Sequence, residues 1–96
     1  LLSNYPTSDL APDAQAYIAE SLFREKNYAG ADVAYAAVVT KYPESPKAPT
    51  SLSKRAQIAA LQGNTTEARR LFTDVISKYP KSDEAVLAAD ELKRPR

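Results

Sequence analysis

The sequence predicts an all-α protein, built as a right-handed α-solenoid of stacked helical hairpins about two and a half units long. First, the phrase Tyr-Pro-x-Ser occurs at Tyr5, Tyr42 and Tyr79, each copy 37 positions after the previous one. Second, the apolar residues between the copies recur at three- and four-residue spacing, which is the period of a helix. Third, each phrase contains a proline, which ends a helix because it has no amide hydrogen. Self-similarity at this spacing is typical of arrays in which each unit packs against its neighbour.

The 37-residue period divides the chain into four segments of a single domain. Residues 1–6 are predicted to be the end of a preceding helix, so we expect the natural protein to extend upstream. Residues 10–43 form the first repeat, 45–80 the second, and 83–93 a C-terminal helix.

The first repeat begins with a helix expected from Leu10 to Lys26, followed by Asn27, which tolerates left-handed backbone geometry at a helix end. A second helix follows and stops before Pro43. The predicted apolar stripe of the first helix consists of Ala14, Ile18, Leu22 and Phe23. That of the second helix consists of Ala31, Ala34, Tyr35, Val38, Val39 and Tyr42.

The second repeat follows the same plan. Ser45 and Pro46 begin its first helix, which ends at Gly63, and Asn64 with Glu67 has the spacing of a capping box. The buried stripes are expected at Leu52, Ala56, Ala59 and Ala60, then at Ala68, Leu71, Phe72, Val75, Ile76 and Tyr79. Ser82 should cap the final helix, whose apolar residues are Ala85, Leu87, Ala88, Ala89 and Leu92.

Small residues are expected where the two helices of each hairpin cross, because a methyl group lets the backbones approach closely. These positions are Ala19, Ala31, Ala56 and Ala68. Tyr35 and Phe72 would fill the wider gap toward the next unit, so Phe72 is predicted to be a principal core residue.

Composition excludes several classes of function. The formal net charge is +1 with both signs interspersed, so no nucleic-acid footprint is expected. The chain has no histidine and no cysteine, the commonest metal ligands and catalytic groups, and only two glycines for a phosphate-binding loop. No apolar run is long enough to insert into a membrane. We therefore expect no catalytic residue, no cofactor and no metal.

The small residues at the crossings, the aromatics Tyr35 and Phe72, and the closing prolines Pro43 and Pro80 match the tetratricopeptide repeat, whose usual unit is about 34 residues. The longer link and the string from Ala11 to Glu20 resemble the C-terminal repeat domain of the Tol-Pal system protein YbgF, also called CpoB. The chain departs from the pattern at Arg55, where an apolar residue is usual.

The YbgF resemblance implies a non-catalytic interaction module in the periplasm. It would bind TolA, with a peptidoglycan synthase as a further partner, and coordinate envelope constriction with peptidoglycan synthesis in cell division. YbgF proteins trimerise through an upstream coiled coil. The resemblance therefore implies that these residues alone are monomeric and that the full-length protein could be trimeric through such a coiled coil. The alternative is a scaffold subunit of an outer-membrane assembly machine, similar to BamD, which shares the Tyr-Pro-x-Ser link.

A partner-binding groove is predicted along the first helices of the two repeats, which line the concave side of such arrays. Tyr17 and Phe23 either anchor a ligand there or fill a gap against a preceding unit, and the sequence leaves both open. Counting from Ala19 and Ala56, the groove residues are Asp13, Ala16, Tyr17, Glu20, Phe23, Arg24, Thr50, Ser53, Gln57 and Leu61.

Overall fold

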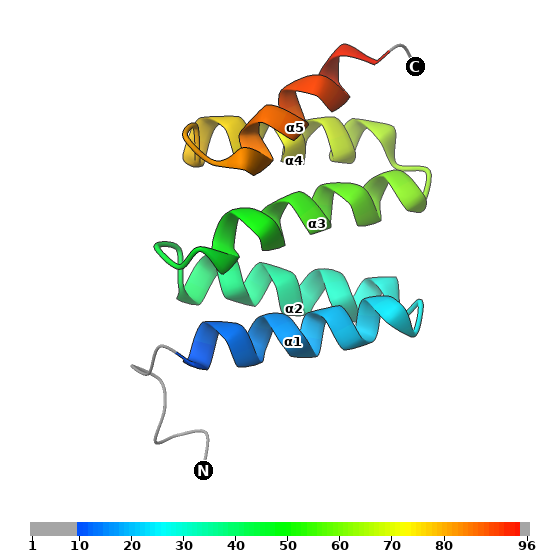
Figure 1. The fold of residues 1–96 in the computed structure, drawn as a ribbon. Coiled ribbons are helices and arrows are strands. Elements are labelled where there is room, and N and C mark those ends of the chain that lie inside the picture. Colours follow the sequence, from blue (N-terminus) through cyan, green and yellow to red (C-terminus); the bar gives the residue numbers. More distant parts are fainter. Residues whose placement is uncertain (1–9, 95–96) are drawn as a thin grey trace.

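The computed structural model describes residues 10–94, which form five helices and no strand (Figure 1). The helices are α1 (Leu10–Arg24), α2 (Tyr28–Lys41), α3 (Lys47–Leu61), α4 (Thr65–Lys78) and α5 (Asp83–Lys93). The prediction of an all-α array of stacked hairpins is confirmed. The predicted end of a preceding helix, residues 1–6, lies outside the described residues.

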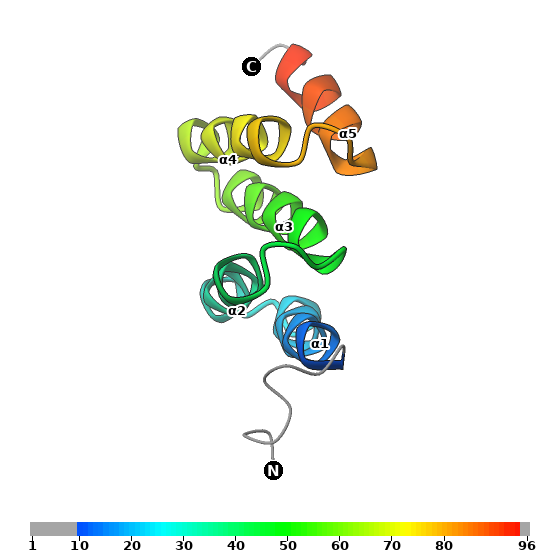
Figure 2. The ribbon, with the colours of Figure 1, turned by 90° about the vertical axis from the view of Figure 1, so that its left-hand side faces the viewer.

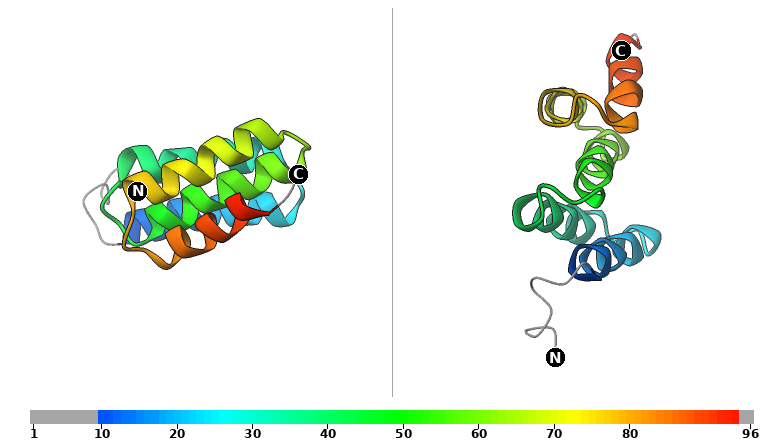
Figure 3. Two further views of the ribbon diagram at one scale, coloured as in Figure 1. Left: turned by 90° about the horizontal axis from the view of Figure 1, so that it is seen from above. Right: turned by 60° about the vertical axis from the view of Figure 1, so that its left-hand side comes forward.

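The helices form an elongated stack with dimensions of 47 × 30 × 15 Å. Figure 2 shows α1, α3 and α5 on one side of the stack and α2 and α4 on the other. Seen from above, the helices lie one over another, as in Figure 3. This arrangement leaves one side of each first helix available to solvent.

Each hairpin turns at a residue with left-handed backbone geometry. These residues are Lys26, with φ of 63°, and Gly63, with φ of 79°. The expectation that α1 reaches Lys26 and that Asn27 takes the left-handed geometry is wrong. The helix ends at Arg24, and Asn27 has a φ of −83°. The period aligns Lys26 with Gly63, so comparison of the two units identifies the correct residue.

The asparagine after each turn caps the second helix of the hairpin. The side-chain oxygen of Asn27 accepts a hydrogen bond from the Gly30 amide at 3.1 Å, and that of Asn64 accepts from the Glu67 amide at 3.2 Å. Only this half of the predicted capping box forms. The Glu67 carboxylate binds Arg70 instead of reaching back to the amide of Asn64.

We predict that Lys26→Gly stabilises the protein by about 1 kcal/mol. Left-handed geometry strains a residue with a Cβ atom by roughly 1–2 kcal/mol, and the greater unfolded-state freedom of glycine offsets part of the gain. The reciprocal variant, Gly63→Ala, should lose about 1 kcal/mol for the same reason. Urea denaturation measures both changes. Equal stability of Lys26→Gly and the parent would contradict the explanation.

Successive Tyr-Pro links contact each other along the stack. The Tyr79 hydroxyl donates a hydrogen bond to the Pro43 carbonyl at 2.9 Å, across 36 positions of sequence. The Ser82 hydroxyl donates to the carbonyl of Tyr79 at 2.7 Å and accepts from the amide of Ala85 at 3.0 Å, which caps α5 as predicted. The recurring tyrosine and serine therefore have structural roles at the junction between units.

The core consists of two clusters of buried side chains. One lies between α1, α2 and α3 and contains Tyr35, and the other lies between α3, α4 and α5 and contains Phe72. Tyr35 is 3% exposed and Phe72 is 4% exposed, as the sequence predicts. The crossing residues are also buried, at 2% exposure or less: Ala19, Ala31, Ala56 and Ala68.

Part of the predicted apolar stripe of α1 is exposed. Ala14 is exposed, and Ile18 is 46% exposed. One repeat later the position of Ile18 is occupied by Arg55, which pairs with Asp32 of α2. Within residues 10–94 no helix lies on the corresponding side of α1, so these apolar residues lack a neighbour.

Ala60, which was predicted to be buried, is exposed, and so is Leu87 among the apolar residues of the final helix. Ala60 borders a hollow that is also lined by Phe72 of α4 and Glu91 of α5, which do not cover it. By helical period alone, Ala60 and Leu87 could both belong to a buried stripe. Which side chains are covered depends on how the neighbouring helices pack.

Ser51 in α3 carries a buried hydroxyl that has no hydrogen-bond partner. The positions one repeat before and after it are Ala14 and Ala88. An unsatisfied buried polar group costs roughly 1–3 kcal/mol. We therefore predict that Ser51→Ala raises the free energy of unfolding by about 1 kcal/mol. Thermal and urea denaturation test this, with Ser77→Ala on the exposed side of α4 as a control for helix propensity. A destabilised Ser51→Ala variant would show that the hydroxyl has a partner in solution.

Candidate functional site

The exposed side of the first helices is the candidate binding surface, and we call it the first-helix face. It carries Tyr17, Glu20 and Arg24 of α1, Gln57 and Leu61 of α3, and Leu87 of α5. Adjacent first helices touch: the Thr50 hydroxyl of α3 donates a hydrogen bond to the Glu84 carboxylate of α5 at 2.8 Å. The Lys54 ammonium of α3 also lies over the Phe23 ring of α1, so the three helices form one continuous surface.

Nine of the ten predicted groove residues are at least partly accessible. Asp13, Tyr17, Glu20, Arg24, Gln57 and Leu61 are exposed, and Ala16, Phe23 and Thr50 are half-buried. Three large apolar side chains stand out on the first-helix face: Tyr17 at 62% exposure, Leu61 at 59% and Leu87 at 62%.

Ser53 is the exception, because it is only 6% exposed. It lies one turn after Thr50, on the side of α3 that meets α5 through the Thr50–Glu84 hydrogen bond. Its assignment to the groove is therefore corrected. The groove residues of α3 were assigned from the period of that helix alone. That assignment does not consider α5, which packs beside Ser53 of α3.

Phe23 fills a gap within the array. Its ring packs edge-to-face on Tyr28 with centroids 5.6 Å apart, and the Lys54 ammonium lies 5.0 Å above its centroid. A cation over an aromatic face contributes about 0.5–1 kcal/mol at exposed sites. Phe23 thus packs within its own unit and against the following one, not against a preceding unit, whereas Tyr17 is exposed.

A hollow of about 310 Å³ lies beside the C-terminal half of α3. It is lined by Gln57, Ala60, Leu61, Phe72 and Glu91, which come from α3, α4 and α5. Gln57 and Leu61 belong to the predicted groove, whereas Ala60, Phe72 and Glu91 do not. Ala60 and Phe72 were counted only as core, and the contribution of α5 was not considered.

The charges on the first-helix face are mixed in sign. Arg24 lies 3.5 Å from Glu20, and Arg94 lies 3.6 Å from Glu91. The Glu20 charge also acts on the buried Tyr35 behind this face: burial raises the pKa of the Tyr35 phenol, and the negative charge of Glu20 raises it further. These short-range pairs leave no broad field of one sign, so the face does not suit a highly charged tail.

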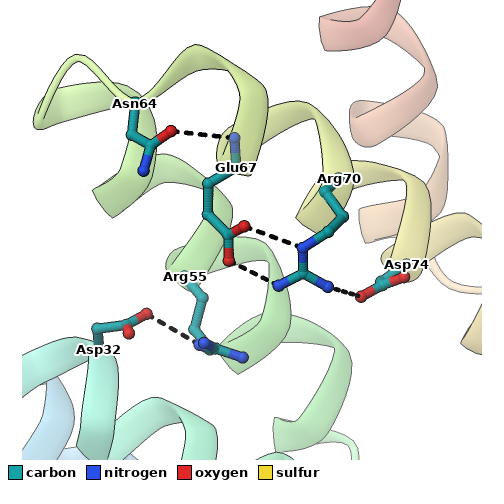
Figure 4. Close-up of polar contacts among 6 residues, drawn as sticks. All are labelled: Asp32, Arg55, Asn64, Glu67, Arg70 and Asp74. Atoms are coloured by element: carbon teal, nitrogen blue, oxygen red, sulfur yellow. Dashed lines mark hydrogen bonds and ion pairs between the residues drawn. The ribbon is translucent and has the colours of Figure 1, made fainter.

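Figure 4 shows two neighbouring sets of polar contacts, one within α4 and one between α2 and α3. Arg70 binds Glu67 with contacts of 2.9 and 2.6 Å, and also lies 3.2 Å from Asp74. The hydrogen bond from Arg70 lowers the pKa of the Glu67 carboxyl.

Arg55 forms the second set, in which its Nε atom lies 2.9 Å from the Asp32 carboxylate. The repeat pattern usually has an apolar residue at this position. The pair with Asp32 is half-buried, with side-chain exposures of 23% and 35%. Of these contacts, only the Arg55–Asp32 pair joins two helices, and those of Arg70 stabilise α4 itself.

The described residues contain no cluster of three or more side chains that could hold a metal ion. No helix between residues 10 and 94 has the length and apolar content needed to span a membrane. What the geometry offers is a side-chain surface for contact with another molecule.

Comparison with known families agrees with the fold. The tetratricopeptide repeat model matches residues 13–45 and 50–82, which covers more than half of the chain. The protein therefore belongs to the tetratricopeptide repeat family. Repeats of this kind are interaction modules rather than catalytic folds. No curated protein sequence matches the chain.

Proposed function

We propose that this domain is a protein-interaction module of the bacterial cell envelope that binds a segment of a partner along the first-helix face. The observation that carries the proposal is the exposure of Tyr17, Leu61 and Leu87 on the first helices of three successive units. Aromatic and large apolar residues that are exposed on a rigid scaffold are the usual anchors of protein interfaces. The rest of the face is small or polar, which suits an extended or helical peptide.

The Tyr-Pro-x-Ser links and the opening helix support a more specific proposal. Their resemblance to the YbgF repeat domain favours a periplasmic protein that binds TolA and takes part in Tol-Pal-dependent cell division. The Tyr79–Pro43 hydrogen bond gives the regular spacing of the links a structural reason. The links therefore carry less weight for function than the string from Ala11 to Glu20.

The test is calorimetric titration of the periplasmic part of TolA into the wild-type domain and into Tyr17→Ala and Leu61→Ala. Loss of a buried anchor at an interface costs at least about 1 kcal/mol of binding free energy. Each variant should keep the thermal stability of the parent, because both side chains are mostly exposed.

Val33→Ala is the matched control, since Val33 is 70% exposed but lies on α2, on the other side of the stack. The proposal expects the control to bind like the wild type. Unchanged affinity in both first-helix variants would move the site elsewhere on the domain. Absence of binding by the wild-type domain would reject TolA as the partner.

A further inference from the structure

The hollow beside Ala60 lies at the place that the Phe23 ring fills one repeat earlier. Its five lining residues correspond one by one to residues of the first unit through the 37-residue period. Gln57, Ala60, Leu61, Phe72 and Glu91 stand where Glu20, Phe23, Arg24, Tyr35 and Lys54 stand. The two sites therefore share one scaffold and differ in their side chains.

In the first unit this place is full. The Phe23 ring contacts Tyr28 from the side and has the Lys54 ammonium above it. In the second unit the ring is replaced by the methyl group of Ala60, and Tyr28 is replaced by Thr65. By this correspondence the hollow, which Ala60 lines, lies where the first unit has the Phe23 ring.

We propose that this hollow accepts an aromatic side chain of the partner protein, so that the partner supplies the ring that Ala60 lacks. The inference rests on the proposed function, since it names the chemistry that one part of the first-helix face recognises. The floor is Phe72, which is almost fully buried, and Leu61 forms an exposed apolar wall. A cavity of about 150 Å³ already holds benzene, so a hollow of about 310 Å³ has room for a ring.

The charge above the hollow differs from that of the first unit and sets the preferred partner sequence. Glu91 occupies the repeat position of Lys54, so a carboxylate instead of an ammonium borders the hollow. A negative group favours a cation beside the incoming ring. Arg94 pairs with Glu91 at 3.6 Å and competes for it, which limits the preference to a few-fold. The partner segment is thus an aromatic residue flanked by lysine or arginine.

Three capped peptides test this by NMR titration of the isotope-labelled domain: Gly-Arg-Phe-Arg-Gly, Gly-Glu-Phe-Glu-Gly and Gly-Arg-Ala-Arg-Gly. The first should bind about tenfold more tightly than the third, which has no ring, and a few-fold more tightly than the second. The shifted resonances should be those of Gln57, Ala60, Leu61, Phe72 and Glu91. Equal affinity of the first and third peptides, or shifts confined to other residues, would overturn the proposal.

Two variants sharpen the result. Ala60→Phe should fill the hollow as Phe23 does and abolish the preference for the ring while leaving the domain folded. Glu91→Lys should restore the charge of the first unit and reverse the preference between the arginine- and glutamate-flanked peptides. If Ala60→Phe still bound the phenylalanine peptide more tightly than the alanine peptide, the partner ring would have to bind at another place. If no peptide bound but TolA did, the proposal for the hollow would be rejected and the proposed function would stand. If the peptides bound but TolA did not, TolA would be rejected as the partner and the proposal for the hollow would stand.

Discussion

Replacement of Phe72 by alanine is expected to leave the domain largely unfolded at room temperature. The ring is 4% exposed and belongs to the cluster that joins α3, α4 and α5. Truncation of a buried phenylalanine costs about 3–5 kcal/mol. A domain this small rarely has more than about 3–5 kcal/mol of total stability. The helical circular dichroism of Phe72→Ala should therefore be mostly lost and its thermal transition should disappear.

Val33→Ala provides the reference for this experiment. It also shortens an apolar side chain in the second helix of a repeat, but Val33 is 70% exposed, so its melting temperature should stay within a few degrees of the parent. A cooperative melt of Phe72→Ala near that of the parent would mean that the ring is not central to the core.

The second large effect is expected from Ala56→Leu. Ala56 is fully buried where α3 crosses α4, and Ala68 lies in the same cluster. Additional carbon atoms in a well-packed core force backbone shifts that cost about 1–3 kcal/mol. We expect the upper part of this range, because the crossing depends on close approach of two backbones. Urea denaturation measures the loss.

Ala60→Leu is the matched control, with the same substitution one turn later in the same helix. Ala60 is exposed and borders the hollow, so the added atoms should be tolerated or should stabilise the protein slightly. If Ala56→Leu were no more destabilising than Ala60→Leu, the crossing would have more space than the structure indicates.

Much of the fold could be predicted because the same pattern of apolar residues and prolines recurs in both repeats. Tyr35 and Phe72 occupy the same position in two units, so each supports the assignment of the other. The turn residue was misassigned to Asn27 because the prediction used the preference of asparagine for left-handed geometry. Alignment with Gly63 identifies Lys26, a residue that such preferences do not favour.

The binding surface could be predicted only in part. Counting around one helix correctly placed Tyr17, Gln57 and Leu61 on an exposed side. It failed for Ser53, because burial there depends on how closely α5 approaches α3. It also missed Glu91, which reaches the hollow from a different helix. Such contacts depend on the distances between helices, which the period of a single helix does not give.

The nearest-neighbour arrangement of the stack also affects how the domain opens. The helix α3 contacts helices on both sides, whereas the Ile18 side of α1 has no neighbour within the described residues. In such quasi-one-dimensional arrays, stability is a sum of unit and interface terms. Amide protons of α1 should therefore exchange with deuterium through local fraying from that end, and those of α3 only through opening of most of the array. The domain would then show a gradient of protection along its long axis, rather than a single global opening event.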